Sequence, residues 1–431
     1  MSGSTTPSKY LLQSIVTGNV FNDTGWLLDA PGESKPGLIR TIYENQLLQV
    51  QDASSGLYKF AGWLPILRML KGSSAPVTYR SEHLAKKLNL LNLYITFSGY
   101  WPEKGAFMET CSFKETEAFS VCARLDPEAG KVLVVASAGN TARAFAKVCS
   151  DNNIPLLLSV PEDNLDALWF EQPLDPCVRL IASQSGGDYF DAIHLSNLVC
   201  KLDGFIAEGG AKNVARRDGM GTTVLSATTF IGRVPDYYFQ AVGSGTGAIA
   251  AWEANLRLIN DGRFGTHKMK LIVSQNAPFN PIYEAWKAGS REMLEYEDTL
   301  AHTHVEEIDA KVLSNRRPPY PIAGGLFDAL IDTEGDVMKV TNEEAREANK
   351  EFFLSEGIDI HPAAAVATAS LINAVDSGRI NPEAVIMLNI TGGGEERFKQ
   401  NKQLFYLKPN LVFPINPSES EVVRELAKLR W

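Results

Sequence analysis

Short, uninterrupted runs of apolar residues dominate the chain from about residue 76 onward. Such runs, rich in Val, Ile and Leu and bounded by turn residues, are typical of strands buried on both faces of a parallel sheet. Stretches with helical periodicity, such as 140–152 and 188–202, lie between them. Strands that alternate with helices predict an α/β architecture with right-handed crossovers. The apolar runs are 92–97, 131–137, 154–160, 177–183, 236–243, 269–275 and 384–390.

Three other regions have a different pattern. The first 60 residues are broken by Gly, Pro, Asn and Asp, and predict a loop-rich or short-stranded lead-in. Residues 285–355 are more polar and predict a helical or loop insertion. The small residues of 361–375 predict a helix suited to close packing.

Composition narrows the class of protein. With 431 residues, 45% apolar and 21% charged, the chain is expected to form two or three globular domains. The net charge of −10 argues against a nucleic-acid or anionic-membrane partner, but not against a small anionic substrate. No apolar run approaches the roughly 18 residues that span a bilayer, and the N-terminus lacks a signal-peptide layout. We therefore expect a cytoplasmic protein.

The cysteines and histidines do not predict a metal site. None of the five cysteines forms a C-x-x-C pair, so neither a zinc ribbon nor a redox dithiol is indicated. Their odd number and scatter are typical of reduced thiols in a core. His302 and His304 are expected to lie in a solvated loop.

Three glycine-rich loops follow predicted strands: SAGNTA at 137–142, GSGTGA at 243–248 and TGGGEE at 391–396. In open parallel sheets, ligands bind beyond the carboxyl ends of the strands. A glycine-rich turn that leads into a helix exposes backbone N–H groups that hold a phosphate or a carboxylate.

The loop at 243–250 can also be interpreted as the dinucleotide fingerprint G-x-G-x-x-A. That interpretation requires a carboxylate about twenty positions on, at the end of the next strand. The next strand ends in Ser274, Gln275 and Asn276, and no Gly-Lys-Ser/Thr follows a glycine loop. A cofactor with a single phosphate fits the loop better than a nicotinamide dinucleotide or a nucleoside triphosphate.

Lys114, in CSFKETEA, has two interpretations by itself. It is either part of a salt-bridged turn that opens a helix or a reactive amine beside a cofactor. A cofactor with one phosphate and an aldehyde needs a lysine for its resting imine, which favours the second interpretation.

A resemblance to a known family rests on four motifs that occur in a fixed order. They are SFK (112–114), SAGNTARA (137–144), GSGTG (243–247) and TGGG (391–394). They resemble the pyridoxal-phosphate enzymes of the threonine synthase and cysteine synthase superfamily (fold type II), including the interval of 26 residues from Lys114 to Asn140. Residues 75–115 and 208–222 resemble specifically the cysteate synthases, which make L-cysteate from O-phospho-L-serine and sulfite. Archaeal members open with a cysteine-rich, zinc-ribbon-like segment, whereas residues 10–45 here contain no cysteine. The fold and the metal of that segment are therefore not carried over.

The resemblance implies an α/β fold like that of the tryptophan synthase β subunit, with two open parallel-sheet domains and pyridoxal 5′-phosphate in the cleft between them. The implied domains are a lead-in (1–75), a larger cofactor-binding domain (76–120 with 205–431) and a smaller domain (121–204). Relatives are often dimers, so a homo-oligomer is expected.

The resemblance also implies the roles of the cofactor-binding residues. Lys114 would form the Schiff base and shuttle the Cα proton, and Asn140 would donate to the pyridoxal 3′-oxygen. Thr391 would bond to the pyridine nitrogen, where a neutral hydroxyl favours β-elimination over transamination. The cofactor phosphate would lie in the loop formed by Gly243, Ser244, Gly245, Thr246 and Gly247.

The implied reaction expels phosphate, leaves a bound aminoacrylate and adds sulfite to it. The start of a helix at Ser137, Ala138, Gly139 and Thr141 suits the substrate carboxylate. The two anions need cations near the β-carbon, for which Lys104 and Arg216 are candidates, with Arg80 and Arg217 behind them. Two alternatives stay open: a sister activity, either threonine synthase or β-replacement with another nucleophile, and a non-catalytic ligand-binding relative.

Overall fold

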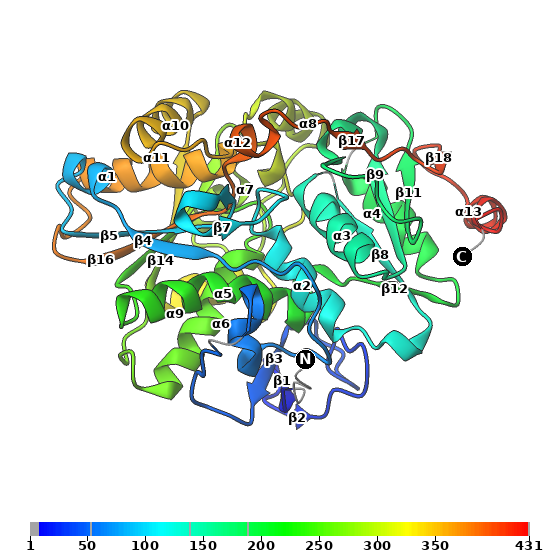
Figure 1. Ribbon diagram of the computed structural model, residues 1–431, viewed down its shortest axis with the longest axis horizontal. Coiled ribbons are helices and arrows are strands. Elements are labelled where there is room, and N and C mark those ends of the chain that lie inside the picture. The colour runs from blue at the N-terminus through cyan, green and yellow to red at the C-terminus, as the bar shows by residue number, and fades with distance from the viewer. Residues whose placement is uncertain (1–7, 52–53, 138, 188, 430–431) are drawn as a thin grey trace.

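The computed structural model describes residues 8–51, 54–137, 139–187 and 189–429. It contains a six-stranded sheet in the order β15-β14-β13-β16-β5-β4 and a five-stranded sheet in the order β12-β8-β9-β11-β18. A smaller sheet, β2-β1-β3, is formed by the lead-in. The two large sheets lie side by side, each covered by helices on both faces (Figure 1).

The six-stranded sheet is parallel except at β4, which runs antiparallel to β5. Helices α10 (Asn342–Glu356) and α11 (Pro362–Asp376) cover one face, and α5 (Val214–Ile231), α6 (Thr246–Asp261) and α9 (Leu326–Asp332) cover the other (Figure 1). Its strands are β4 (Val77–Arg80), β5 (Asn92–Phe97), β13 (Tyr237–Ala241), β14 (Lys270–Asn276), β15 (Asp336–Val340) and β16 (Val385–Ile390).

The five-stranded sheet is parallel throughout. Leu133 and Val135 of β8 pack in the core with α2 (Lys114–Arg124) and α3 (Asn140–Asp151), whereas Val132 and Val134 pack on the other face with α4 (Tyr189–Val199) and α13 (Glu419–Leu426). Burial on both faces is the reason why these strands are continuous apolar runs. Its strands are β8 (Val132–Ala136), β9 (Leu156–Pro161), β11 (Val178–Ser183), β12 (Phe205–Ala207) and β18 (Leu411–Phe413).

Each of the seven apolar runs contains a strand, which confirms the predicted parallel α/β architecture. The prediction of a purely helical or loop insertion at 285–355 is wrong for β15, an edge strand that pairs with β14. Only Val337 and Val340 of its five residues are buried, so β15 lacks the continuous apolar run that marks the inner strands. The predicted domain boundaries stay a prediction, although β18 and α13 from the end of the chain pack with the five-stranded sheet.

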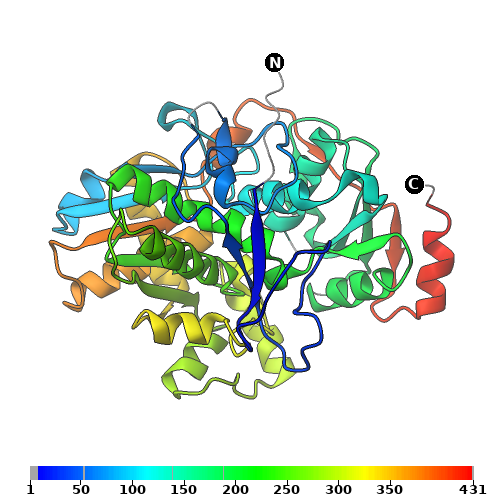
Figure 2. The same ribbon diagram turned by 90° about the horizontal axis from the view of Figure 1, so that it is seen from below.

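The lead-in forms the antiparallel strands β1 (Tyr10–Ser14), β2 (Val20–Phe21) and β3 (Ile39–Tyr43) and a 3₁₀ segment at Gly56–Trp63. Leu12 and Ile39 pack against Val214 of α5. Figure 2 shows the lead-in, in dark blue, lying across the helices on the underside of the larger sheet.

The remaining elements are short. They are α1 (His83–Lys87), β6 (Tyr100–Trp101), β7 (Ala106–Phe107), β10 (Trp169–Phe170), α7 (Pro281–Lys287), α8 (Asp298–Glu307), α12 (Glu395–Lys399) and β17 (Phe405–Tyr406). Of the helices in the described ranges, none is both long and apolar enough to cross a membrane.

Candidate active site

The segment that carries Lys114 is paired with the glycine-rich loop after β16. The Phe113 N–H donates to the Thr391 carbonyl at 3.0 Å, and the Gly393 N–H donates to the Cys111 carbonyl at 3.1 Å. Ser112 and Gly392 form an antiparallel bridge between these two bonds. This backbone pairing of Cys111–Phe113 with Thr391–Gly393, which we call the brace, holds Lys114 and Thr391 close together.

Lys114 is the first residue of α2, and its side chain turns toward the third residue after it. Its Nζ donates to Oε2 of Glu117 at 3.2 Å. The Glu117 side chain is fully buried, and the Lys114 side chain is 20% exposed. Burial lowers the pKa of Lys114 below its ordinary value, the Glu117 carboxylate raises it, and the Arg216 charge lowers it again. A lowered pKa increases the share of neutral, nucleophilic amine at neutral pH.

Glu117 also binds Arg216, which extends the charge cluster away from Lys114. Oε1 of Glu117 lies 3.2 Å from Nη2 of Arg216, and Arg216 donates from Nε and Nη2 to both oxygens of Glu208 at 2.8 Å. Burial lowers the pKa of Arg216, but the Glu117 and Glu208 carboxylates outweigh it and raise that pKa. Arg216 is therefore charged and engaged by two carboxylates.

Asn140 opens α3, and its side-chain amide has a defined orientation. Oδ1 of Asn140 accepts from Nη2 of Arg143 at 2.9 Å. A guanidinium has no acceptor, so the atom that faces it must be the amide oxygen, and the NH₂ group of Asn140 points elsewhere. The same Arg143 lies 3.6 Å from Oε2 of Glu395, just after the loop that contains Thr391, and thereby links the two loops.

Glu395 is held from two sides. Nε2 of His361 lies 3.0 Å from its Oε2, and Nζ of Lys399 lies 2.6 Å from its Oε1. Burial by itself raises the pKa of Glu395, but the His361 hydrogen bond and the Arg143 charge lower it to about 2. Glu395 is therefore an anion at neutral pH, and its charge holds Arg143 beside Asn140.

The loop Gly243–Gly247 leaves β13, the neighbour of β16 in the sheet, and leads into α6. Oγ of Ser244 and Oγ1 of Thr246 lie 2.9 Å apart. Among the described residues, no backbone carbonyl accepts from the N–H groups of Gly243, Ser244, Gly245 or Gly247. Unpaired amides, two hydroxyl groups and the start of a helix are features suited to an anion site.

Gly245 is required for the shape of that loop. Its φ is +78°, and a Cβ there would lie 2.7 Å from Cδ2 of Leu326. A side chain at this position is therefore opposed both by the backbone conformation and by the packing behind it.

Two of the backbone N–H groups predicted to bind the substrate carboxylate already donate to acceptors within the protein. The Ser137 N–H donates to the Ser159 carbonyl, and the Gly139 N–H donates to Oγ of Ser137, both at 3.1 Å. Thr141 lies in the first turn of α3, whose start has no side-chain cap, and Ala138 lies outside the described residues.

The residues predicted as cations near the substrate β-carbon have different contacts from one another. Lys104 is exposed, with its Nζ 4.7 Å from the centre of the Tyr79 ring and 5.5 Å from that of Trp101. Arg80 donates to the Leu91 carbonyl, and Arg217 is buried in an ion pair with Glu253. Arg216 lies beside the site lysine but is engaged by Glu117 and Glu208.

Sequence reasoning missed Glu117, Arg143 and Glu395. Glu117 follows Lys114 by three residues and Arg143 follows Asn140 by three, a spacing that places two side chains on the same face of a helix. This spacing was the available signal. The contact between Arg143 and Glu395 joins distant segments and had no local signal.

Comparison with known proteins identifies relatives of this chain. The family described as "Pyridoxal-phosphate dependent enzyme" matches residues 101–392. The chain is 48% identical to the cysteate synthase of Methanosarcina acetivorans over 382 residues, which cover 88% of this chain and 91% of that protein. It is also 48% identical to the cysteate synthase of Methanocella paludicola, over 90% of this chain and 91% of that protein. Maize serine racemase has a similar fold, with a TM-score of 0.56 and 15% identity over 74% of this chain and 88% of that structure.

Proposed function

The chain belongs to the cysteate synthase family of pyridoxal-phosphate dependent enzymes, and from this premise we propose that it makes L-cysteate and phosphate from O-phospho-L-serine and sulfite. The observation that carries the proposal is the brace, which pairs the backbone just before Lys114 with the backbone from Thr391 onward at the carboxyl edge of the larger sheet.

The residues present fit the cofactor. The unpaired amides and the hydroxyl groups of the loop Gly243–Gly247 suit its phosphate. Lys114 suits its aldehyde because burial lowers the pKa of the amine. The amide NH₂ of Asn140 suits the ring oxygen, since Arg143 fixes the opposite end of that amide. When bound, the cofactor withdraws electrons from the substrate Cα.

Lys114 moves the proton in this proposal. Its neutral amine takes the Cα proton while the Cβ–O bond breaks and the phosphate leaves with the bonding pair. The sulfur lone pair of sulfite then forms the new bond to Cβ, and Lys114 returns the proton to Cα. In its charged state the amine is stabilised by Glu117, which lies 3.2 Å away.

Thr391 favours elimination over transamination. A carboxylate opposite the pyridine nitrogen would keep that nitrogen protonated, whereas a hydroxyl does not. Thr391 is buried, with 8% exposure, so water competes little for its hydroxyl.

The test is an assay with O-phospho-L-serine and sulfite in parallel with O-phosphohomoserine alone, both analysed by mass spectrometry. We expect cysteate from the first mixture and no threonine from the second. The reverse result would identify a threonine synthase and overturn the proposal. Lys114→Ala is expected to lower turnover by at least about 10³-fold, as loss of a proton-transfer group does, whereas the exposed Lys201→Ala is expected to keep it.

We also propose a reducing, cytoplasmic location and a homo-oligomeric state. Free thiols support the location, because all five cysteines are unpaired, including Cys122 and Cys149 with their sulfur atoms 3.6 Å apart. Gel filtration with light scattering measures the oligomeric state.

A further inference from the structure

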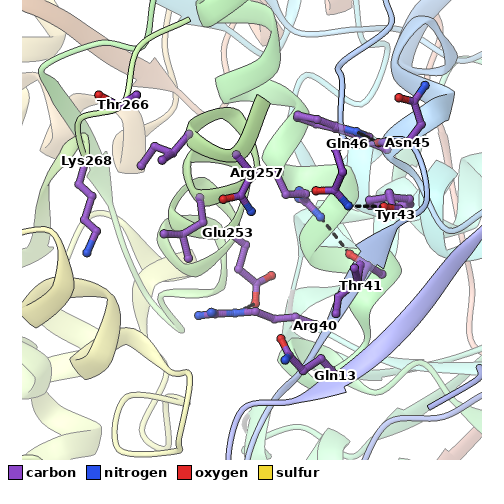
Figure 3. Close-up of a pocket in the computed structure, with 15 residues that line it drawn as sticks. Gln13, Arg40, Thr41, Tyr43, Asn45, Gln46, Glu253, Arg257, Thr266 and Lys268 are labelled. Carbon is purple, nitrogen blue, oxygen red and sulfur yellow. Dashed lines mark hydrogen bonds and ion pairs between the residues drawn. The ribbon is translucent and has the colours of Figure 1, made fainter. Parts of the chain in front are cut away.

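A concave site lies between the lead-in and helix α6, away from the candidate active site. Its volume is about 340 Å³, within the range of small-molecule pockets. Arg40, Thr41 and Tyr43 of β3 form one wall, and Glu253 and Arg257 of α6 form another (Figure 3). These α6 residues lie one to three turns beyond the loop Gly243–Gly247, so the pocket is separate from the candidate active site. We call it the lead-in pocket.

Arg40 is held in place by two neighbours and still has donors to spare. Its Nε donates to Oε1 of Glu253 at 3.0 Å, and its guanidinium lies 4.1 Å from the centre of the Trp252 ring. Its Nη2 is buried and has no hydrogen-bond partner among the described residues. A guanidinium fixed by stacking and by one ion pair presents its remaining N–H groups in a defined direction, as oxyanion binding requires.

Arg257 repeats this arrangement on the other side of Glu253. Its Nη1 donates to Oδ1 of Asp218 at 2.5 Å and to Oγ1 of Thr41 at 2.9 Å. Its Nε is buried and also has no partner in the described part of the chain. Buried donors without partners are uncommon in folded proteins, and here two of them belong to arginines that line one pocket.

The charges around the pocket do not cancel. Glu253 is shared by Arg40 and Arg217, Asp218 binds Arg257, and Asp332 binds Lys268. Arg40, Arg257, Lys268 and Glu253 line the pocket, and Arg217, Asp218 and Asp332 are their ion-pair partners outside the lining. Together these four cations and three carboxylates leave one positive charge in excess. This local positive charge contrasts with the net charge of −10 for the whole chain.

We propose that the lead-in pocket binds a small metabolite with one net negative charge, whose carboxylate, phosphate or sulfonate accepts from the guanidinium of Arg40. The side-chain amides of Gln13, Gln46 and Asn260 also line the pocket and hold the polar body of the ligand. The ligand contacts both the lead-in and α6, so its binding strengthens the attachment of the lead-in to the larger domain.

The test is isothermal titration of the enzyme loaded with its cofactor. The probes are inorganic phosphate, sulfate and L-cysteate, with L-serine, which has no net charge, as the control. We expect the wild type to show one more anion site per chain than Arg40→Gln, or binding at least about tenfold tighter, as loss of a charged hydrogen bond predicts. Arg346→Gln, which removes an exposed arginine paired with Asp309, is the matched control and is expected to bind like the wild type.

A second variant leaves the charges unchanged. Asn260 is exposed on the last turn of α6, and Asn260→Trp fills the pocket from its rim. We expect it to abolish the same site that Arg40→Gln weakens. Identical titrations for the wild type and both variants, or no binding of any anionic probe to the wild type, would overturn the proposal. Dissociation of an oligomer by Arg40→Gln would also overturn it, because the pocket would then be an interface between copies of the chain.

Discussion

Two glycine-rich loops leave neighbouring strands of the same sheet, and their backbones are used in opposite ways. The loop after β13, Gly243–Gly247, has amides without carbonyl partners in the described structure. The loop after β16, Thr391–Gly393, is paired with Cys111–Phe113. The first is suited to bind an anion, whereas the second positions Lys114.

The comparison shows that glycine has two separate uses at strand ends. In the loop Gly243–Gly247 it exposes N–H groups to a ligand. In the brace it allows two backbones to approach: a Cβ at Gly392 would lie 2.3 Å from Nδ1 of His361 and 2.9 Å from the Cys111 carbonyl. Sequence alone does not separate these uses, because both appear as glycine-rich turns after apolar runs.

The largest effect is expected from Gly392→Ala. Its Cβ collides with a backbone carbonyl and with a histidine ring that Glu395 holds, so we expect a loss of unfolding free energy of at least about 3 kcal/mol. In Gly247→Ala the obstructing atom is the end of the Gln240 side chain, at 2.6 Å, and the expected loss is about 1 kcal/mol. Urea unfolding of both apoproteins measures the difference. Equal losses would contradict the distinction between the two loops.

The next largest expected effect is a pH-dependent change in stability caused by Glu115. This side chain accepts from the Thr110 N–H at 2.6 Å beside the brace. Burial raises the pKa of Glu115 from 4.5 to about 7. The folded state therefore retains a proton that the unfolded state releases, and stability falls as pH rises from about 4.5 to about 7. Glu115→Gln removes this loss, so at pH 8 the variant is expected to be more stable than the wild type by about 3 kcal/mol.

The control for Glu115→Gln is the same comparison at pH 4, where both side chains are neutral. There the two proteins are expected to unfold at nearly the same urea concentration. A difference that does not change with pH would show that the carboxyl group of Glu115 does not titrate near pH 7.

A smaller effect is expected in the loop Gly243–Gly247. Ser244→Ala/Thr246→Ala removes the two hydroxyl groups that we propose as donors to the cofactor phosphate, together with the Ser244 Oγ that accepts from the Thr246 N–H at 3.3 Å. We expect the dissociation constant for pyridoxal phosphate to rise at least about tenfold. The unfolding free energy of the apoprotein is expected to fall by only about 1 kcal/mol, because Thr246 is buried and one hydrogen bond to its N–H is lost. A large loss of stability would assign a structural role to this loop as well.

The smallest expected effect is a shift in the pKa of Lys114, and its direction depends on which neighbouring residue is changed. Glu117 raises the pKa of Lys114 and Arg216 lowers it. Glu117→Gln is therefore expected to move the pH midpoint of cofactor capture by the apoprotein downward, and Arg216→Gln is expected to move it upward. The visible absorbance of the bound cofactor reports the midpoint, and the exposed Glu44→Gln is the control. Shifts in the same direction would indicate general disruption of the cluster.

Much of the fold was predictable because burial on both faces leaves a direct trace in the sequence. β8 and β16 are continuous apolar runs, and each begins within one residue of its predicted start. β15 was not predictable because it lies at an edge of the sheet and only two of its five residues are buried.

In the candidate site, the residues predicted to face the ligand were identified from motifs, whereas most of the contacts that hold them in place were not. Lys114, Asn140 and Thr391 follow from four short motifs in a fixed order. The engagement of Arg216 by Glu208 and the link from Arg143 to Glu395 depend on long-range packing. A surface arginine and a doubly paired buried arginine look the same in one sequence.

The position of β16 has a consequence for synthesis of the protein. β16 lies between β13 and β5 in the sheet, although it is the last of the six strands along the chain. During synthesis on the ribosome, β5 and β13 therefore lack the strand that joins them until Val385–Ile390 has emerged. The strand edges that β16 will cover are exposed in the meantime and are open to aggregation. Lys114 is therefore synthesised early, but the brace that positions it forms only when translation is nearly finished.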